Sequence, residues 1–388
     1  RIALLFLATL VLLSSSSVFL LAAVTGDCVN CHTMHNSQDG NTVVDTSDNS
    51  NVAQMNLLTS DCLGCHTNPN GNQTILNIGT GNTSRVPIVF TASAPTYPPD
   101  GSTSSALAGG NFYWVAKEGD QFGHNVYGLR GGINEADSNL RVAPGGFSCM
   151  GDCHATLATP TSGCRGCHFP AHHADDGDPN DAVDSGDGWY RFLSGVTMLT
   201  NRNTVQSLRE ELLAQPAVSG IEDPDWEQNP NAHHNVYKGT TTAYQHAEGE
   251  DMYPGSVADN SIGAYCSGCH SNFHHENGYA EPGGGMGSPG AWIRHPSDVV
   301  IPNEREYAYA TTYDPLAPVA LTNLGAGSIY GTEVNVGSDV VTCISCHRPH
   351  GSPYPDMLRW DYMNDCNTGV AATVENPCGC FSCHTGKD

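Results

Sequence analysis

Hydrophobic and polar positions follow a clear period in only a few parts of this chain. A capping box between Ser207 and Glu210 predicts a helix over residues 207–214, which a proline then ends. Residues 113–116 predict a short strand, and the Pro, Gly and Ser residues of 91–110 predict a linker. The pattern therefore predicts short elements joined by irregular connections.

The longest apolar stretch lies at the start of the sequence. Residues 1–24 carry two apolar runs separated by four serines, with small residues after the second run. This arrangement predicts a secretory leader, which leaves residues 25–388 as a single domain outside the cytoplasm. A retained membrane anchor is the alternative, because the two apolar runs together reach the length that spans a bilayer.

Composition limits the kind of core that the chain can build. The sequence holds 43 Gly and 23 Pro among 388 residues, and 39% of its residues are hydrophobic. This composition is typical of loop-rich proteins rather than of helical bundles or α/β domains. A stable fold therefore needs apolar surface from a source other than the side chains.

A repeated cysteine motif identifies that source. Cys-x-x-Cys-His occurs six times, and a seventh copy has one extra residue between its cysteines. Two thiols one helical turn apart can bond to the two vinyl groups of one porphyrin, while the adjacent His ligates its iron. The motif residues are Cys28, Cys31 and His32; Cys62, Cys65 and His66; Cys149, Cys153 and His154; Cys164, Cys167 and His168; Cys266, Cys269 and His270; Cys343, Cys346 and His347; and Cys380, Cys383 and His384.

The repeat predicts seven covalently attached haem c groups. Structural zinc is the alternative, but zinc sites combine one cysteine pair with a second pair or with a spaced His pair, whereas each pair here has its own His. The irregular copy at Cys149 also allows a disulfide or a chance pair. We predict a loop-rich multihaem cytochrome with low regular secondary structure, in which short helices and turns wrap around a haem chain.

The second axial ligand of each iron separates electron carriers from enzymes. A distal side chain gives a carrier, and an open iron gives an enzyme. Seven of the 18 His belong to the motifs, so eleven can serve as distal ligands, and the 8 Met show no comparable pattern. The eleven are His35, His124, His172, His173, His233, His234, His246, His274, His275, His295 and His350.

Some of these histidines repeat at fixed distances from a motif. Cys-His-x-x-His occurs at His32/His35 and at His347/His350, and Cys-His-x3-His-His also occurs twice. A second His so near the first cannot reach the opposite face of the same haem, so we expect it to ligate a neighbouring haem. We predict bis-His haems of low potential, and the choice within each His-His pair stays open. The predicted distal ligands are His35, His124, His172, His234, His274, His295 and His350.

The chain is strongly acidic. It has 40 acidic and 15 basic residues, a formal net charge of −25, which repels phosphate backbones and excludes nucleic acid as a partner. Acidic side chains in residues 175–187 have EF-hand-like spacing but lack the turn Gly and the final Glu. We interpret this stretch as a solvated loop, with a weak calcium site as the alternative.

Two cysteines lie outside the motifs. Cys366 and Cys378 enclose a short loop, which in a secreted protein predicts a disulfide. The alternative is that Cys378 competes with Cys380 as the first thiol of the last haem motif.

Several landmarks outside the haem motifs point to a family. They are Tyr-Trp-Val-Ala-Lys at 113–117, Gly-His-Asn at 123–125, Ala-Pro-Gly-Gly at 143–146 and Arg-His-Pro at 294–296. Together with the motifs, and in this order through most of the chain, they resemble the extracellular multihaem cytochrome nanowires. The hexahaem pattern of that family lacks the motif at Cys149.

The resemblance implies a homopolymer. In that family the second His of the first Cys-His-x-x-His motif ligates a haem of the next subunit. The matching residue here is His35, and the matching acceptor is the haem of Cys343, Cys346 and His347. Haems stacked in alternating parallel and T-shaped pairs then form a continuous electron path along the filament.

The additional motif departs from the family pattern. A haem at Cys149 would either extend the main chain of haems or hang from it as a branch. Its distal ligand, or one that the insertion displaces, is expected from His233, His234 or His246.

We predict that the chain transfers electrons over long range and is not an enzyme. It would be secreted and form an extracellular or cell-surface filament, with redox partner proteins as donors and an extracellular electron acceptor. A monomeric periplasmic electron shuttle is the first alternative. A multihaem oxidoreductase with one open haem is the second, and the Cys149 motif is where such an iron is expected.

Overall fold

The computed structural model describes the parts of the chain that carry five of the seven motifs in whole or in part. The described residues are 32–35, 37–38, 41–42, 57, 62–68, 70–78, 84–97, 106–126, 128–129, 157, 163–168, 190–193, 218–241, 260–267, 270, 295, 297–366 and 378–386. They include His32 of a sixth motif. The predictions for 1–24, 175–187 and 207–214 lie outside them, as do Cys28, Cys31, Cys149, Cys153, His154, His172, Cys269 and His274.

Regular elements are short throughout the described residues. The α-helices are α2 (Tyr113–Glu118), α5 (Ile262–Ser267), α6 (Cys343–Cys346) and α7 (Tyr362–Asp365). The 3-10 turns are η2 (Cys62–Gly64), η3 (Asp120–Phe122), η5 (Gly163–Gly166), η7 (Tyr190–Phe192), η9 (Arg305–Tyr309), η10 (Leu324–Ala326), η11 (Pro355–Met357) and η12 (Gly379–Ser382). The predicted loop-rich fold is confirmed. None of these helices has the length and apolar character to span a bilayer.

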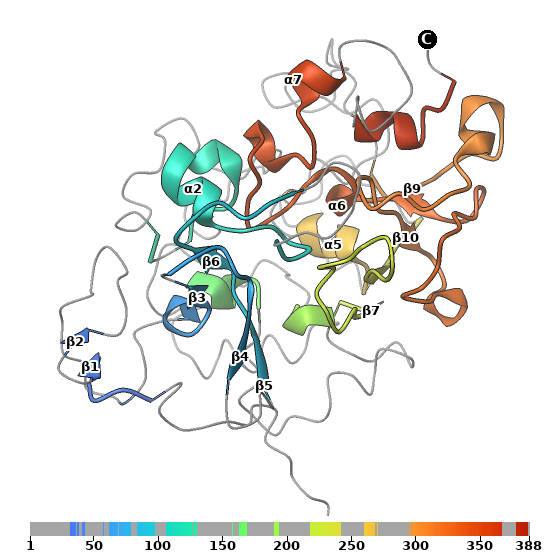
Figure 1. Cartoon of the computed structure of the whole chain (residues 1–388). Coiled ribbons are helices and arrows are strands. Elements are labelled where there is room, and N and C mark those ends of the chain that lie inside the picture. The colour runs from blue at the N-terminus through green and yellow to red at the C-terminus, as the bar shows by residue number, and fades with distance from the viewer. Residues whose placement is uncertain are drawn as a thin grey trace, which may run out of the picture.

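The sequence pattern did not predict a five-stranded sheet, here called the central sheet. Its strands β7, β9 and β10 lie beside α5 and α6 in Figure 1. Its spatial order is β7-β8-β10-β11-β9, with β8 and β10 parallel and the other pairs antiparallel. The strands are β7 (Gly220–Ile221), β8 (Val236–Lys238), β9 (Val299–Val300), β10 (Ala320–Leu321) and β11 (Val340–Val341). Strands of two or three residues are too short to show a period of two.

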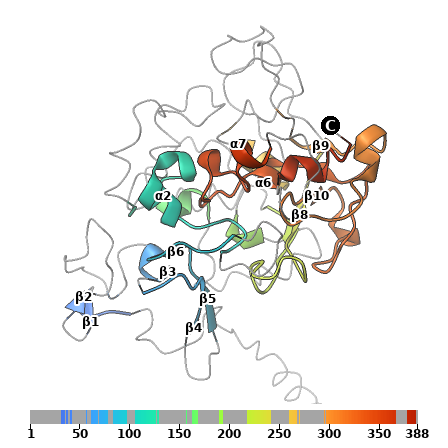
Figure 2. The same ribbon diagram turned by 45° about the horizontal axis from the view of Figure 1, so that its top comes forward.

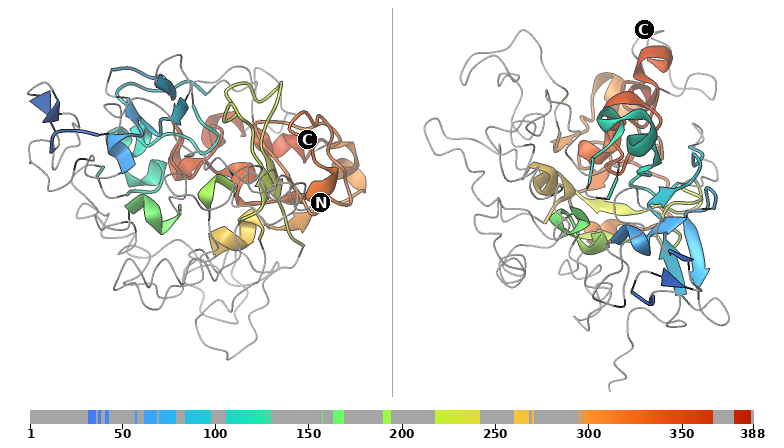
Figure 3. Two further views of the ribbon diagram at one scale, coloured as in Figure 1. Left: turned by 90° about the horizontal axis from the view of Figure 1, so that it is seen from below. Right: turned by 90° about the vertical axis from the view of Figure 1, so that its left-hand side faces the viewer.

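Smaller, two-stranded sheets form in the N-terminal part of the chain. Parallel β3 (Thr67–Asn68) and β6 (Phe90–Thr91) form one, and the hairpin of β4 (Ile75–Ile78) and β5 (Ser84–Pro87) forms another. A third pairs β1 (Ser37–Gln38) with β2 (Asn41–Thr42). Figures 1, 2 and 3 show that β1 and β2 lie at the edge of the molecule, away from the central sheet.

The strand prediction for residues 113–116 is wrong, because these residues begin α2. The side chain of Asn111 accepts a hydrogen bond from the backbone N–H of Tyr113 at 2.9 Å, which satisfies a donor at the start of the helix. Val115 is the buried residue of α2, and it packs this helix against Leu63 and Phe112. The linker prediction for 91–110 also fails at its ends, because Thr91 is buried in β6 and the backbone of Gly110 pairs with Gly351.

Backbone hydrogen bonds join the region around α2 to a segment far away in the sequence. Residues 109–111, before α2, and residues 122–124, at the end of η3, both bond to residues 349–352. The bonds are His350 N to Gly109 O at 2.7 Å, Asn111 N to Gly351 O at 3.0 Å, Ser352 N to Phe122 O at 3.0 Å and His124 N to Pro349 O at 3.2 Å. This junction places His124 beside the segment that carries His347 and His350. In Figure 2 part of the red C-terminal ribbon lies next to α2.

The apolar clusters of the fold incorporate cysteines of the motifs. Leu63, Phe112 and Val115 pack with Cys164, and Trp360 and Phe381 pack with Cys346 and Cys380. A further cluster around Ile301 and Val319 contacts Cys383. The attachment positions therefore line the small cores that the chain forms.

Substitutions at two glycines are expected to separate backbone strain from steric exclusion. Gly110 (φ 92°) and Gly119 (φ 124°) both adopt positive φ, but a Cβ at Gly110 would collide with the Gly351 carbonyl, whereas a Cβ at Gly119 meets nothing. Gly119→Ala should lower the free energy of unfolding by about 1–3 kcal/mol through strain alone. Gly110→Ala should lower it by roughly a further 1–3 kcal/mol through the collision. Thermal unfolding followed by circular dichroism measures both, and equal melting temperatures would contradict the steric part.

Candidate haem centres

The described motifs share one backbone turn. In each, the His N–H donates to the carbonyl of the first cysteine four residues earlier, which closes a single helical turn. The lengths are 3.0 Å for His66 to Cys62, 2.8 Å for His168 to Cys164, 3.0 Å for His270 to Cys266, 3.1 Å for His347 to Cys343 and 2.9 Å for His384 to Cys380. The turn places the first thiol, the second thiol and the imidazole side by side, as attachment to one porphyrin requires.

The central sheet positions one of these turns directly. β11 ends at Val341, and Thr342 then caps α6, which consists of the motif residues Cys343–Cys346. The Thr342 N–H donates to the Ser345 hydroxyl at 3.0 Å, which completes a capping box. Since α5 packs on α6, the Cys266 side chain lies against that of Cys343.

Three motif histidines face a histidine from a distant part of the chain. The ring centroids of His168 and His350 lie 5.9 Å apart, those of His270 and His124 lie 6.0 Å apart, and those of His384 and His295 lie 6.2 Å apart. In each pair one ring belongs to a motif and the other is a predicted distal ligand. His350 follows His347 by three residues yet faces His168, the histidine of a different motif.

The separation of these rings fits two axial ligands of one iron. A bond from an imidazole nitrogen to a transition metal is about 2 Å long, and the nitrogen lies roughly 1 Å from its ring centre, so two ligands on opposite sides place their centroids about 6 Å apart. Direct stacking brings rings closer, as in the 3.7 Å between His234 and Tyr313. The three His pairs therefore have the spacing that an intervening iron requires.

Hydrogen bonds orient two rings of these pairs, those of His124 and His168, and two further motif rings, those of His66 and His347. Nδ1 of His66, His124, His168 and His347 donates to a backbone carbonyl, because a carbonyl oxygen can only accept. The acceptors are Pro87 at 2.6 Å, Pro349 at 2.9 Å, Arg191 at 2.8 Å and Asp356 at 2.9 Å, respectively. This bond fixes the tautomer and leaves Nε2 with a lone pair for a metal.

His384 differs in the acceptor that its Nδ1 contacts. That nitrogen lies 2.9 Å from Oε1 of Glu306, a carboxylate, and Tyr307 packs edge-on against the same ring at 5.1 Å. A carboxylate acceptor makes an imidazole ligand more electron-donating than a carbonyl does. The last motif therefore has an electronically distinct proximal histidine.

Burial keeps the inner imidazoles neutral, which is the form that binds iron. Desolvation and, to a lesser degree, the neighbouring His270 lower the pKa of His124 to about 4. Desolvation lowers the pKa of His350 to about 3, and it also lowers the pKa of His168 and of His347. These rings carry no proton at their second nitrogen at neutral pH.

Arg359 is buried and Arg348 is half-buried, and neither forms an ion pair with a carboxylate among the described residues. Arg348 and Arg359 donate to the backbone carbonyls of Ala108 at 3.0 Å and Ile344 at 2.7 Å. Desolvation and, to a lesser degree, the nearby charge of Arg359 lower the pKa of Arg348 to about 10. Two cations that repel each other and are largely removed from water are unfavourable unless an anion lies near. The carboxylates of a porphyrin fit this requirement.

The thiols of the motifs lie in surroundings that favour a neutral sulfur. Burial raises the pKa of Cys346 to about 12 and that of Cys383 to about 11. A hydrogen bond with Cys343 and burial raise the pKa of Cys266 well above its ordinary value. A thioether to a vinyl carbon is uncharged, so these positions fit the covalent attachment that the motifs predict.

The structure argues against His234 as a distal ligand. Its Nδ1 lies 2.8 Å from the carbonyl of Asn235 and its Nε2 lies 2.7 Å from that of Gly331. In this arrangement neither nitrogen could bind a haem iron without losing its contact with a carbonyl oxygen. His233 is also engaged, with Nδ1 2.6 Å from Asp223 Oδ1 and Nε2 3.5 Å from Asp225 Oδ2.

The N-terminal histidines lie on the surface. His32 and His35 are exposed, and His35 adopts a left-handed conformation with φ of 57°. This turn precedes β1 at the edge of the molecule (Figure 3). His35 is therefore placed where a second molecule could reach it.

Sequence reasoning missed Glu306, Arg348 and Arg359. Glu306 is separated from His384 by 78 positions, so no local pattern connects them. Arg359 likewise reaches the site only through the fold. Arg348 directly follows His347, and a cation beside a motif was a signal that the sequence contained.

Comparisons with known proteins agree with the motifs. A family model described as a doubled CXXCH motif matches residues 334–388, which hold the last two motifs and support covalently bound haem c there. Two similar solved structures come from Geobacter sulfurreducens. One is the Outer Membrane Cytochrome S filament, 22% identical over 87% of this chain and 84% of that chain, with a TM-score of 0.44. The other is a cryo-EM structure of the OmcS nanowires, 21% identical over 91% and 87%, with a TM-score of 0.41. At these values neither similarity carries an argument about function, and no curated protein matches the chain.

Proposed function

We propose that the chain is an electron-transfer protein that carries seven c-type haems with two His ligands each. The observation that carries the proposal is the set of three imidazole pairs with ring centroids 5.9 to 6.2 Å apart. When bound, haem iron supplies reversible one-electron redox chemistry. The residues that would hold three of the irons are His168 with His350, His270 with His124, and His384 with His295.

One segment of the polypeptide supports close spacing of three centres. The segment of residues 343–350 supplies its own motif, offers His350 to the centre of His168, and orients His124 through the Pro349 carbonyl. One short segment thus touches three centres, which supports close spacing and electron exchange between them. Residues that occupy both faces of an iron also exclude substrate, so no turnover is proposed.

Carbon monoxide binding to the reduced native protein tests this ligation. Six-coordinate low-spin irons do not bind carbon monoxide, and we expect no change in the Soret band and no high-spin ferric signal in electron paramagnetic resonance. A carbon monoxide adduct of the native protein would indicate an open iron and favour the oxidoreductase alternative, with the Cys149 centre as the first place to look.

We further propose that the chain is secreted and polymerises into an extracellular filament. The family landmarks and the exposed position of His35 at the molecular edge support a bond from His35 to the iron of His347 in the next subunit. Electrons would enter from redox partner proteins and leave to an extracellular acceptor. A monomeric periplasmic shuttle is the alternative, in which His35 would serve within its own chain.

Removal of the charge at Glu306 is expected to raise the potential of one haem. Glu306→Gln keeps an acceptor for His384 Nδ1 but removes the carboxylate that makes the imidazole electron-rich. The lowest-potential component should shift upward on the order of 50 mV, about tenfold in the redox equilibrium constant. Spectroelectrochemical titration measures the shift. Glu304→Gln, an exposed position beside the same turn, should leave the titration unchanged, and an equal shift in both variants would refute the local effect.

A further inference from the structure

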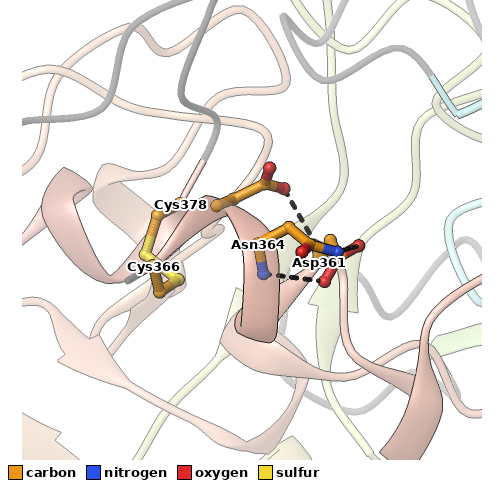
Figure 4. Close-up of a disulfide and its surroundings, with 5 residues drawn as sticks. Asp361, Asn364, Cys366 and Cys378 are labelled. Carbon is orange, nitrogen blue, oxygen red and sulfur yellow. Dashed lines mark hydrogen bonds between the residues drawn. A yellow bond between two sulfur atoms is a disulfide. The ribbon is translucent and has the colours of Figure 1, made fainter. Parts of the chain in front are cut away.

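Three cysteine sulfurs meet beside the last motif. Sγ atoms of Cys366, Cys378 and Cys380 all lie within 4.8 Å of one another. Cys366 follows α7, which Asp361 caps through Asn364, and forms a disulfide with Cys378 (Figure 4). The disulfide prediction is confirmed, and only Cys380 of the three remains a thiol.

Without the disulfide, two thiols would compete for one vinyl group. Cys380 precedes Cys383 by three positions and Cys378 precedes it by five, and both lie within the same 4.8 Å cluster. In the attachment reaction a thiol adds across a vinyl group, so that sulfur bonds to one carbon and hydrogen passes to the other without net oxidation. The Cys378 sulfur therefore lies so close to the Cys380 sulfur that its position alone does not exclude Cys378 from haem attachment.

The backbone shows which of the two belongs to the haem turn. Cys380 accepts from His384 N at 2.9 Å, as the first cysteine does in the other described motifs, whereas the Cys378 carbonyl accepts from Phe381 N at 3.1 Å. Cys378 is fully buried among Leu316, Trp360 and Phe381. A Cβ at Gly379 would collide with the Trp360 ring, so the chain passes tightly there.

We propose that Cys366 is a guard cysteine, whose disulfide withholds Cys378 from haem attachment and thereby leaves Cys380 and Cys383 as the attached pair. The inference rests on the proposed haem at this motif. The disulfide forms when two thiols pass two electrons and two protons to a thiol-disulfide oxidant of the secretory compartment. A free Cys380 thiolate could attack this disulfide and release Cys378. Conversion of Cys380 to a thioether removes that thiolate, so attachment and disulfide protect each other.

Peptide mass spectrometry of two variants tests the proposal. In the native protein, the haem peptide should carry thioethers at Cys380 and Cys383 only. Cys366→Ser should yield a mixture in which part of the haem is bonded to Cys378 and Cys380 is free to react with iodoacetamide. Cys366→Ser/Cys378→Ser, which removes the competitor, should restore the single native product.

The alternative outcomes are distinct. A Cys366→Ser protein with haem only at Cys380 and Cys383, and with Cys378 alkylated, would overturn the guard role. If Cys366→Ser yields no holoprotein, formation of holoprotein by the double variant supports the guard role. Failure of both variants to form holoprotein would assign the disulfide to stability alone and overturn the guard role. Absence of haem from this peptide in the native protein would instead refute the proposed function.

Discussion

Replacement of His350 by alanine is expected to open one iron to solvent. The ring of His350 lies 5.9 Å from that of His168 and packs against that of Phe112 at 4.8 Å, centroid to centroid. Its backbone N–H donates to the Gly109 carbonyl, so no other described histidine can take its place without movement of this junction. The centre of His168 should become high-spin in the ferric state. After reduction it should bind carbon monoxide, with one equivalent taken up per chain.

The matched control removes a second histidine whose ring nitrogens are engaged elsewhere in the structure. His234 is buried, but both of its nitrogens contact carbonyl oxygens. His234→Ala should lower stability while all irons stay low-spin, because the lost contacts are hydrogen bonds and stacking on Tyr313. Carbon monoxide binding by His234→Ala but not by His350→Ala would reverse the ligand assignment.

Replacement of His35 by alanine is expected to abolish filaments. If His35 supplies an iron ligand to the next subunit, its loss breaks a metal bond at every interface, and the polymer should fall to short pieces or single subunits. Electron microscopy of the secreted protein measures filament length. The separated subunits should retain the haem of His347 with an open distal face that binds carbon monoxide.

An adjacent exposed residue supplies the control for this prediction. Met34 is 69% exposed on the same turn, so Met34→Ala changes the surface without removal of a ligand. Its filaments should match those of the native protein. Equal loss of filaments in both variants would indicate a packing interface, and monodisperse particles in the native sample would exclude the polymer.

The motifs and the loop-rich architecture could be predicted because they depend on local sequence. Each motif closes one helical turn, so residue spacing alone describes its geometry. The Cys366–Cys378 disulfide was predictable for the same reason, since a short loop joins the two residues. Pairing of His168 with His350 was not predictable, because the contact depends on a backbone junction between segments more than 200 positions apart, as the separation of Arg348 and Ala108 by 240 positions illustrates.

The errors also have physical reasons. Tyr113 belongs to a helix because the side chain of Asn111, two residues earlier, satisfies its backbone N–H, a local cap that outweighs the strand preference of aromatic residues. His234 has the same local sequence as His124, His-Asn-Val-Tyr, but only His124 meets a motif histidine. Identical short sequences therefore serve different roles, and the difference comes from the carbonyl of Gly331 that occupies the second nitrogen of His234.

A cryo-EM map of the native secreted protein tests the central claim most directly. Our account predicts seven porphyrins per chain, with His350, His124 and His295 opposite His168, His270 and His384. It also predicts a continuous series of closely spaced haems that passes from one subunit to the next through His35. Isolated subunits, a porphyrin with an empty distal face, or a break in the series between subunits would contradict the account.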